Sequence, residues 1–219
     1  MPQYKLHYFD IRGMAEPARL IFHFAGQEFE DRRYDRQAEW PKVKPIEDLE
    51  DNYLRIPLLT SETGKAPWLD VDNERIYESL ALTRYLGRKF NLAGKDEMES
   101  AQINSIVDTC KDFFDEVQSY LSVKRGRSEG NLEELRPKYD ETCKKWYTYL
   151  QSRLDKAKSG FITSKISWGD FLLAEGILTM QNFDEEFTGK YPKIVEYKER
   201  VYSHPKIKEY VEKRGDLLY

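Results

Sequence analysis

Two places in the sequence combine residue types that could bind and activate a small thiol. Tyr8 lies near the end of Tyr4–Phe9, where the side chains alternate as in a half-buried strand. Ser79 follows Glu78 and opens an apolar-periodic stretch that runs to Phe90, in the place that a helix N-cap occupies. A phenol at a strand end and a helix N-terminus in one α/β unit could hold a thiol and a carboxylate together. This pattern predicts the binding and ionisation of a small thiol peptide.

The elements that would position these residues follow one another in the N-terminal part of the chain. We expect a strand, a helix, a strand, a two-stranded hairpin and a helix over residues 3–9, 16–25, 28–34, 67–77 and 79–90. Gly26 is placed as the stop of the first helix, and Asp72-Asn73 as the two-residue turn of the hairpin. The strand–helix–strand part would pair in parallel and the hairpin antiparallel, which is a thioredoxin-type layout.

Strand signals disappear from about Glu97 onward. Apolar residues recur at helical spacing in four stretches, 103–114, 135–154, 171–183 and 194–211. Ser167 and Asp170 precede one of these stretches with the spacing of a capping box, which indicates a helix start. We therefore expect an α/β domain over residues 1–88, a linker over 88–97 and an all-helical domain over 97–219.

The composition indicates a soluble protein and disfavours several classes of function. The net charge is −4 over 219 residues, and lysines and arginines are mixed with acids, so a nucleic-acid surface is not expected. No apolar stretch approaches the roughly 20 residues that span a bilayer, and the start lacks the apolar segment of a secretory signal. Two cysteines, Cys110 and Cys143, suit a reducing cytoplasm. Three scattered histidines form no metal-ligand spacing, so no metal is expected.

The sequence resembles the cytosolic glutathione transferases, most closely the sigma class with its invertebrate members. The resemblance runs over nearly the whole chain in matching order. It rests on these segments: Tyr8-Phe9, Arg12-Gly13, Ala15-Glu16-Pro17, Arg19-Leu20, Trp40-Pro41, Lys44-Pro45, Glu78-Ser79-Leu80-Ala81, Arg84-Tyr85-Leu86, Leu92-Ala93-Gly94-Lys95, Ile106-Val107-Asp108, Asp112-Phe113, Ser167-Trp168 and Asp170-Phe171.

This resemblance implies a fold, a reaction and a partner. A thioredoxin-like N-terminal domain would hold glutathione, a helical domain would carry the pocket for small hydrophobic electrophiles, and two copies would form a homodimer. A free thiol with a pKa of about 8.5 is only a few per cent ionised near neutrality. The resemblance gives Tyr8 the role of donating a hydrogen bond to the sulfur, which favours the thiolate that attacks the electrophile.

The resemblance also assigns the residues that would hold glutathione. Glu78 and Ser79 would bind the γ-glutamyl end, and Trp40 and Lys44 the glycyl carboxylate. Asp112 would reach the glutathione ammonium of the partner subunit. By residue type alone, these positions are equally consistent with a helix cap, a loop anchor and solvated charges.

A third contact in the family is the backbone of the residue before a cis-proline, which pairs with the cysteinyl unit as a strand edge would. Pro67 and Pro57 compete for this position. Pro57 matches the local apolar pattern, whereas Pro67 lies one hairpin ahead of Ser79. We favour Pro67, with Ala66 before it, because hairpin register tolerates insertions poorly and the surface stretch 44–64 tolerates them well.

Some features leave other functions open. Met14 stands where sigma-class chains usually carry an arginine near the sulfur, and Arg12 or Arg19 could supply that cation. The alternatives are a non-catalytic ligand-binding or lens-structural relative, and a glutathione-dependent prostaglandin isomerase or peroxidase. A thiol-disulfide reductase is disfavoured, because no cysteine precedes Cys110. Side chains that could line the electrophile pocket are Phe9, Met14, Phe114 and Tyr120.

Overall fold

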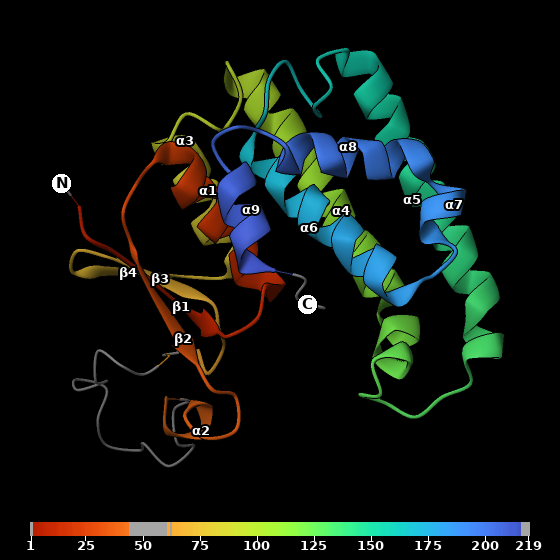
Figure 1. Ribbon diagram of the computed structural model, residues 1–219, viewed down its shortest axis with the longest axis horizontal. Coiled ribbons are helices and arrows are strands. Elements are labelled where there is room, and N and C mark those ends of the chain that lie inside the picture. Colours follow the sequence, from red (N-terminus) through yellow and green to blue (C-terminus); the bar gives the residue numbers. More distant parts are fainter. Residues whose placement is uncertain (1, 44–60, 62, 216–219) are drawn as a thin grey trace. The chain divides into compact units, whose positions relative to one another are not determined.

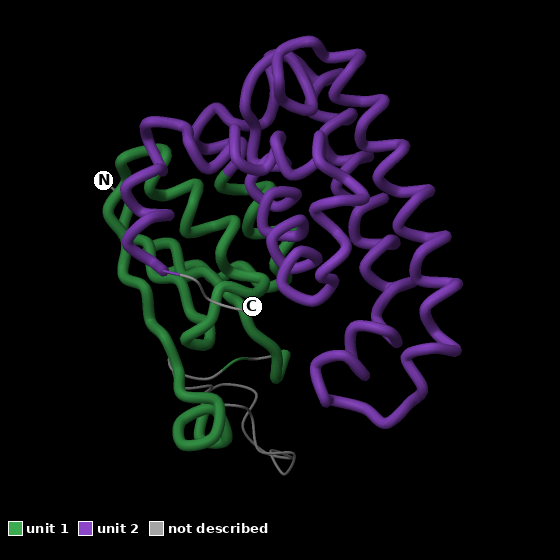
Figure 2. Tube along the Cα trace, turned by 45° about the vertical axis from the view of Figure 1, so that its right-hand side comes forward, with its two compact units in different colours: residues 1–86, 219 green, residues 87–218 purple. Residues whose placement is uncertain are grey.

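The computed structural model describes residues 2–43, 61 and 63–215. The chain divides into two compact units, which Figure 2 colours green for residues 1–86 and purple for residues 87–218. Each unit has its own hydrophobic core.

The first unit is built on a four-stranded sheet. Its strands are β1 (Tyr4–Phe9), β2 (Glu30–Tyr34), β3 (Trp68–Val71) and β4 (Glu74–Tyr77), in the spatial order β2-β1-β3-β4. β1 pairs with β2 in parallel, whereas β1–β3 and β3–β4 are antiparallel. The predicted thioredoxin-like layout is confirmed. β2 starts later than expected because Gln27 still donates its backbone N–H to Phe22 in the preceding helix.

Helices cover this sheet (Figure 1). A 3₁₀ helix, η1 (Gly13–Ala15), leads into α1 (Glu16–Ala25), and α2 (Trp40–Val43) and α3 (Ser79–Lys89) follow. α1 and α3 lie on the same face of the sheet, and their apolar side chains form the core of the unit with those of β1 and β3. Gly26 ends α1 with a φ of 64° and donates its N–H to the last turn, as predicted.

The second unit is helical over its described residues. It contains α4 (Glu97–Lys124), α5 (Leu132–Ala157), α6 (Trp168–Phe183), α7 (Phe187–Lys190), α8 (Pro192–Tyr202) and α9 (Lys208–Arg214). α4 and α5 pack side by side, and α6 packs against both α4 and α8 (Figure 1). Across the described parts of the chain, no helix is both long and apolar enough to cross a bilayer.

The stretch of helical spacing over residues 194–211 forms two helices. The structure ends α8 at Tyr202 and starts α9 at Lys208. Pro205 explains the break, because a proline has no N–H to donate and disfavours helical backbone in the residue before it, His204.

The predicted helix start at Ser167 is confirmed, and it is tied to a wider network. The fully buried carboxylate of Asp170 accepts from the Ser167 backbone N–H (2.8 Å) and hydroxyl (2.7 Å). It also accepts from the Ile162 N–H (3.0 Å) and from the Tyr197 hydroxyl on α8 (2.7 Å). Burial raises the pKa of Asp170, while these four donors oppose that shift. The cap therefore joins α6, α8 and the preceding loop.

We expect Asp170→Asn to lower the free energy of unfolding by about 3 kcal/mol, because the new amide group would face donors where the carboxylate accepted. Asp155→Asn is the matched control, since Asp155 is exposed and accepts one bond from Gln151 (2.8 Å). The control should change stability by less than about 0.5 kcal/mol. Urea unfolding of both variants checks the difference, and similar midpoints would show that the cap network contributes little.

Candidate active site

The Tyr8 hydroxyl lies where the C-terminal end of β1 meets the start of the next helix. Tyr8 is 6% exposed. Its oxygen accepts a hydrogen bond from the backbone N–H of Met14 at 3.2 Å. This N–H belongs to η1, at the start of the helical segment, where backbone donors lack helical acceptors. A bond accepted by the phenol oxygen makes its O–H a stronger donor, which is the property that thiolate stabilisation needs.

Gly13 allows this contact. The sequence predicted only a turn at this position, before the helix. Its φ is 43°, in the left-handed region that favours glycine. A Cβ at this position would lie 2.6 Å from the Tyr8 hydroxyl oxygen and 2.8 Å from its ring carbon Cε1. Any other residue would therefore displace the phenol.

We expect Gly13→Ala to reduce turnover on the order of tenfold, because moving the phenol by about 1 Å costs catalytic alignment. Gly26→Ala is the matched control. Gly26 also has a positive φ, of 64°, but a Cβ there would meet no atom within 4 Å. Both variants should lose about 1 kcal/mol of stability from backbone strain, and only Gly13→Ala should lose activity. Equal turnover of the two variants in steady-state assays would contradict this role of Gly13.

Arg19 holds the loop that follows Tyr8. The sequence alone did not predict this role. Its side chain is fully buried and donates to the carbonyl of Ile11 (2.7 Å) and to the carboxylate of Glu16 (2.9 Å). It also donates to both carboxylate oxygens of Asp31, at 3.0 and 3.2 Å. Its guanidinium is therefore committed to acceptors within the first unit.

One of the two competing prolines lies in the described part of the chain. The Ala66–Pro67 bond is cis, as predicted, and Pro57 lies outside the described residues. The loop before it is held by Ser61, whose hydroxyl donates to the Lys65 carbonyl (2.6 Å) and accepts from the Lys65 N–H (3.1 Å).

Trp40 lies close to the start of β3. Its ring packs edge-on against Phe9 with centroids 5.0 Å apart, and its centroid is 6.5 Å from that of Trp68. Trp68 directly follows Pro67. Trp40 and the Ala66–Pro67 bond therefore both lie next to Trp68. Lys44 lies outside the described residues.

The helix start at Glu78-Ser79 differs from the expected arrangement. α3 begins at Ser79, and the Glu78 carbonyl accepts the N–H of Leu82 at 3.0 Å, so Ser79 is the first helical residue and not the N-cap. Glu78 has a φ of 67°, which is costly for a residue other than glycine. A strained, exposed residue at a helix start is a recognised mark of a ligand site.

The other candidates from the sequence lie in different surroundings. Asp112 and Phe114 are on α4 in the second unit, where Asp112 is exposed. Tyr120, also on α4, is 5% exposed and stacks on Tyr139 of α5 with centroids 4.1 Å apart, so it packs between helices. Met14 is 54% exposed.

Neither cysteine has the properties of a nucleophile. Cys110 and Cys143 are both buried and unbridged. Burial raises the pKa of Cys143 to about 12 and shifts the pKa of Cys110 in the same direction. Both thiols stay protonated at neutral pH, which agrees with a packing role. Among the described residues no group of three or more histidine, cysteine or acidic side chains could hold a metal ion.

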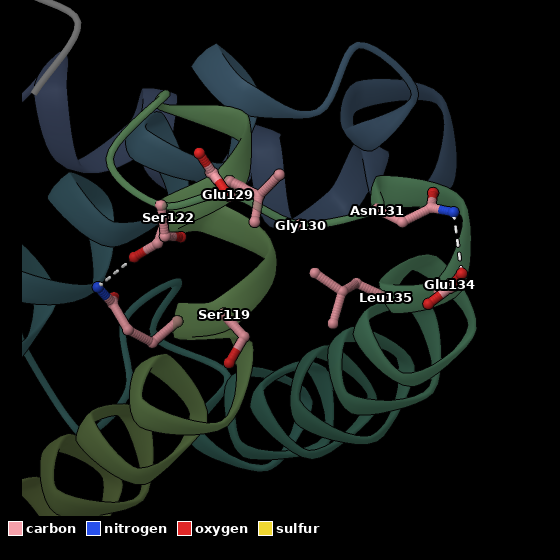
Figure 3. A pocket seen from close by; sticks show the side chains of 10 residues that line it. Ser119, Ser122, Glu129, Gly130, Asn131, Glu134 and Leu135 are labelled. Carbon is pink, nitrogen blue, oxygen red and sulfur yellow. Dashed lines mark hydrogen bonds between the residues drawn. The ribbon is translucent and has the colours of Figure 1, made fainter.

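A separate surface cavity of about 480 Å³ lies in the second unit between the end of α4 and the start of α5 (Figure 3). Ser119 and Ser122 on α4 face Asn131, Glu134 and Leu135 across it. The Asn131 side chain donates to Glu134 at 3.0 Å, and both residues line the cavity. None of the candidate site residues lines it.

A thioredoxin-like unit with a tyrosine at the end of its first strand, followed by an all-helical unit, defines the class of the glutathione S-transferase fold. A family model described as the glutathione S-transferase C-terminal domain matches residues 111–214. The chain is 38% identical over 221 residues to glutathione S-transferase 1 of Ascaris suum, and the match covers 100% of both chains. It is 35% identical over 217 residues to the hematopoietic prostaglandin D synthase of Gallus gallus, covering 98% of each.

The solved structures agree with this assignment. The crystal structure of monomeric Na-GST-3, a glutathione S-transferase from the hookworm Necator americanus, superposes with a TM-score of 0.85 at 34% identity. The match covers 99% of this chain and 100% of that one. The chain belongs to the glutathione S-transferase family of enzymes.

Proposed function

We propose that this protein ionises the thiol of bound glutathione through Tyr8 and joins it to small hydrophobic electrophiles. The thiol proton leaves to solvent, the thiolate sulfur forms a bond to an electrophilic carbon, and the bond from that carbon to its leaving group breaks. The observation that carries the proposal is the Tyr8 hydroxyl oxygen, which accepts from the Met14 N–H at the start of a helical segment. This arrangement suits a phenol that donates to an anion.

Glutathione would lie along the same unit. The backbone of Ala66 before the cis-proline would pair with the cysteinyl unit, and Glu78 and Ser79 would hold the γ-glutamyl end. Trp40, with Lys44, would reach the glycyl carboxylate. The free N–H groups at the start of α3 and its dipole favour a carboxylate there.

The remaining assignments extend this proposal to the whole molecule. We place the protein in the sigma class, as a cytoplasmic detoxifying enzyme that forms a homodimer. In that dimer Asp112 would reach the glutathione ammonium of the partner subunit, and the second unit would supply the electrophile pocket. Sedimentation equilibrium at assay concentrations tests the dimer, and a monomer would remove the role given to Asp112.

Calorimetric titration with glutathione, paired with turnover of an aromatic halide, tests the central proposal. Binding together with turnover supports the transferase, whereas binding without turnover would support the ligand-carrying relative. Absence of binding would refute the whole assignment.

A second candidate is glutathione-dependent isomerisation of a prostaglandin endoperoxide. The observation that favours it is the 35% identity to the chicken relative named hematopoietic prostaglandin D synthase. Incubation with the endoperoxide tests it: product formed only when glutathione is present supports this activity, and product formed equally without it contradicts it.

A further inference from the structure

His7 is completely buried in β1, next to Tyr8 in sequence, and both of its ring nitrogens have partners. Nδ1 lies 2.7 Å from the hydroxyl of Tyr34 on β2, and Nε2 lies 3.0 Å from a carboxylate oxygen of Asp70 on β3. We call these three residues the His7 triad. It links the three adjacent strands of the sheet through side chains as well as through the backbone ladder.

Arg75 on β4 keeps the Asp70 carboxylate charged, and so determines that His7 donates to it. Arg75 donates to the two oxygens of Asp70 at 2.6 and 3.3 Å. Although burial raises it, the hydrogen bonds from His7 and Arg75 hold the pKa of Asp70 below its usual value. Asp70 is therefore a carboxylate that can only accept, so Nε2 of His7 is the donor in the bond between them.

The imidazole of His7 supports the ring of Trp68. The two rings stack with centroids 4.5 Å apart and planes 12° from parallel, and Tyr34 also stacks on Trp68 at 5.8 Å. Trp68 is fully buried, yet within residues 2–43, 61 and 63–215 no acceptor meets its indole N–H. Among these described residues, the indole is held by packing: His7 and Tyr34 stack on it, and the Arg75 guanidinium lies 5.6 Å from its ring centroid.

Trp68 connects the triad to the proposed glutathione site. It follows Pro67 directly in sequence, and its ring centroid lies 6.5 Å from that of Trp40. Trp68 therefore joins the triad to the Ala66–Pro67 backbone through the chain and to the Trp40 indole through ring packing.

We propose that His7, held by Asp70 and Tyr34, is a positioning residue for glutathione binding: it fixes Trp68 and, through it, the Ala66–Pro67 backbone and Trp40. This inference rests on the proposed function, because those two elements are assigned to glutathione there. It predicts an effect on glutathione affinity and none on the thiol chemistry at Tyr8.

Tyr34→Phe tests the inference with little change in shape, since it removes one hydroxyl and keeps the ring. The matched control is Tyr197→Phe in the second unit, which removes an equally buried hydroxyl that donates to Asp170 at the same 2.7 Å. Tyr34→Phe should raise the KM and the calorimetric Kd for glutathione about three- to tenfold, with kcat at saturating glutathione unchanged. Tyr197→Phe should lose similar stability and leave the KM as it is. Equal KM values for the two variants would overturn the inference.

Two further measurements keep the outcomes separate. His7→Phe retains a ring beside Trp68 but loses both tethers, so its KM should rise at least as much as that of Tyr34→Phe. Long-range ¹H–¹⁵N NMR spectra of the three histidines should show His7 protonated on Nε2, and a proton on Nδ1 alone would refute the triad. Wild-type protein that fails to bind glutathione would refute the proposed function, whereas wild-type binding with unchanged variants would refute only the role of His7.

Discussion

Replacing Tyr8 by phenylalanine should lower kcat at neutral pH on the order of a hundredfold while leaving the glutathione Kd nearly unchanged. The variant loses one hydroxyl that stabilises charge on the sulfur, but keeps the backbone and helix-terminus contacts assigned to the rest of the peptide. Stopped-flow or steady-state conjugation of an aromatic halide measures the loss, and calorimetry measures the affinity. Similar kcat values for wild type and variant would refute the role of Tyr8.

The pH profile distinguishes lost thiolate from lost alignment. A thiol with an ordinary pKa of about 8.5 becomes reactive only as the pH approaches that value. The Tyr8→Phe rate should therefore rise with pH up to about 8.5, whereas the wild-type rate should level off at lower pH. Tyr4→Phe is the control, because Tyr4 is a buried tyrosine of the same strand at 4% exposure. It should keep the wild-type profile.

Arg19→Met should destabilise the first unit by about 3–5 kcal/mol, the largest stability effect that we expect for one substitution. Glu16 is 1% exposed and would lose its ion pair with Arg19, and the Ile11 carbonyl would lose its donor. Urea unfolding measures this loss. Because the same bonds shape the loop after β1, activity per folded molecule should fall as well.

Two companion variants make the Arg19 result interpretable. Arg33→Met removes an arginine that bridges Asp10 and Asp31 at 33% exposure, so it should cost less than about 1 kcal/mol. Adding Glu16→Gln to Arg19→Met should recover part of the lost stability, because it removes a buried negative charge that has lost its ion pair with Arg19. If Arg19→Met and Arg33→Met were equally stable, the buried network would not be what holds the loop.

Much of the architecture could be predicted because it depends on local patterns. The strand over Tyr4–Phe9, the helix over residues 16–25 and the glycine after it are encoded in neighbouring residues, and the structure confirms all three elements. The alternation expected of a half-buried strand fails at His7, which is buried together with Leu6 and Tyr8. The same holds for the helix start at Ser167, where cap and partner are three residues apart. The break between the two helices in residues 194–211 also has a local signal, in Pro205.

The sequence by itself determined which elements form, their order and the types of residue available for chemistry at Tyr8 and Ser79. Only the tertiary structure decided how Gly13 and Met14 meet the Tyr8 hydroxyl, and which acceptors occupy Arg19. It alone also brought His7 between Tyr34 and Asp70. The physical reason is that helix and strand periodicity is set by immediate neighbours along the chain. The contacts at Tyr8 and Arg19 depend instead on how the loop after β1 turns back, and those of His7 on which strands pair, across 63 residues between His7 and Asp70.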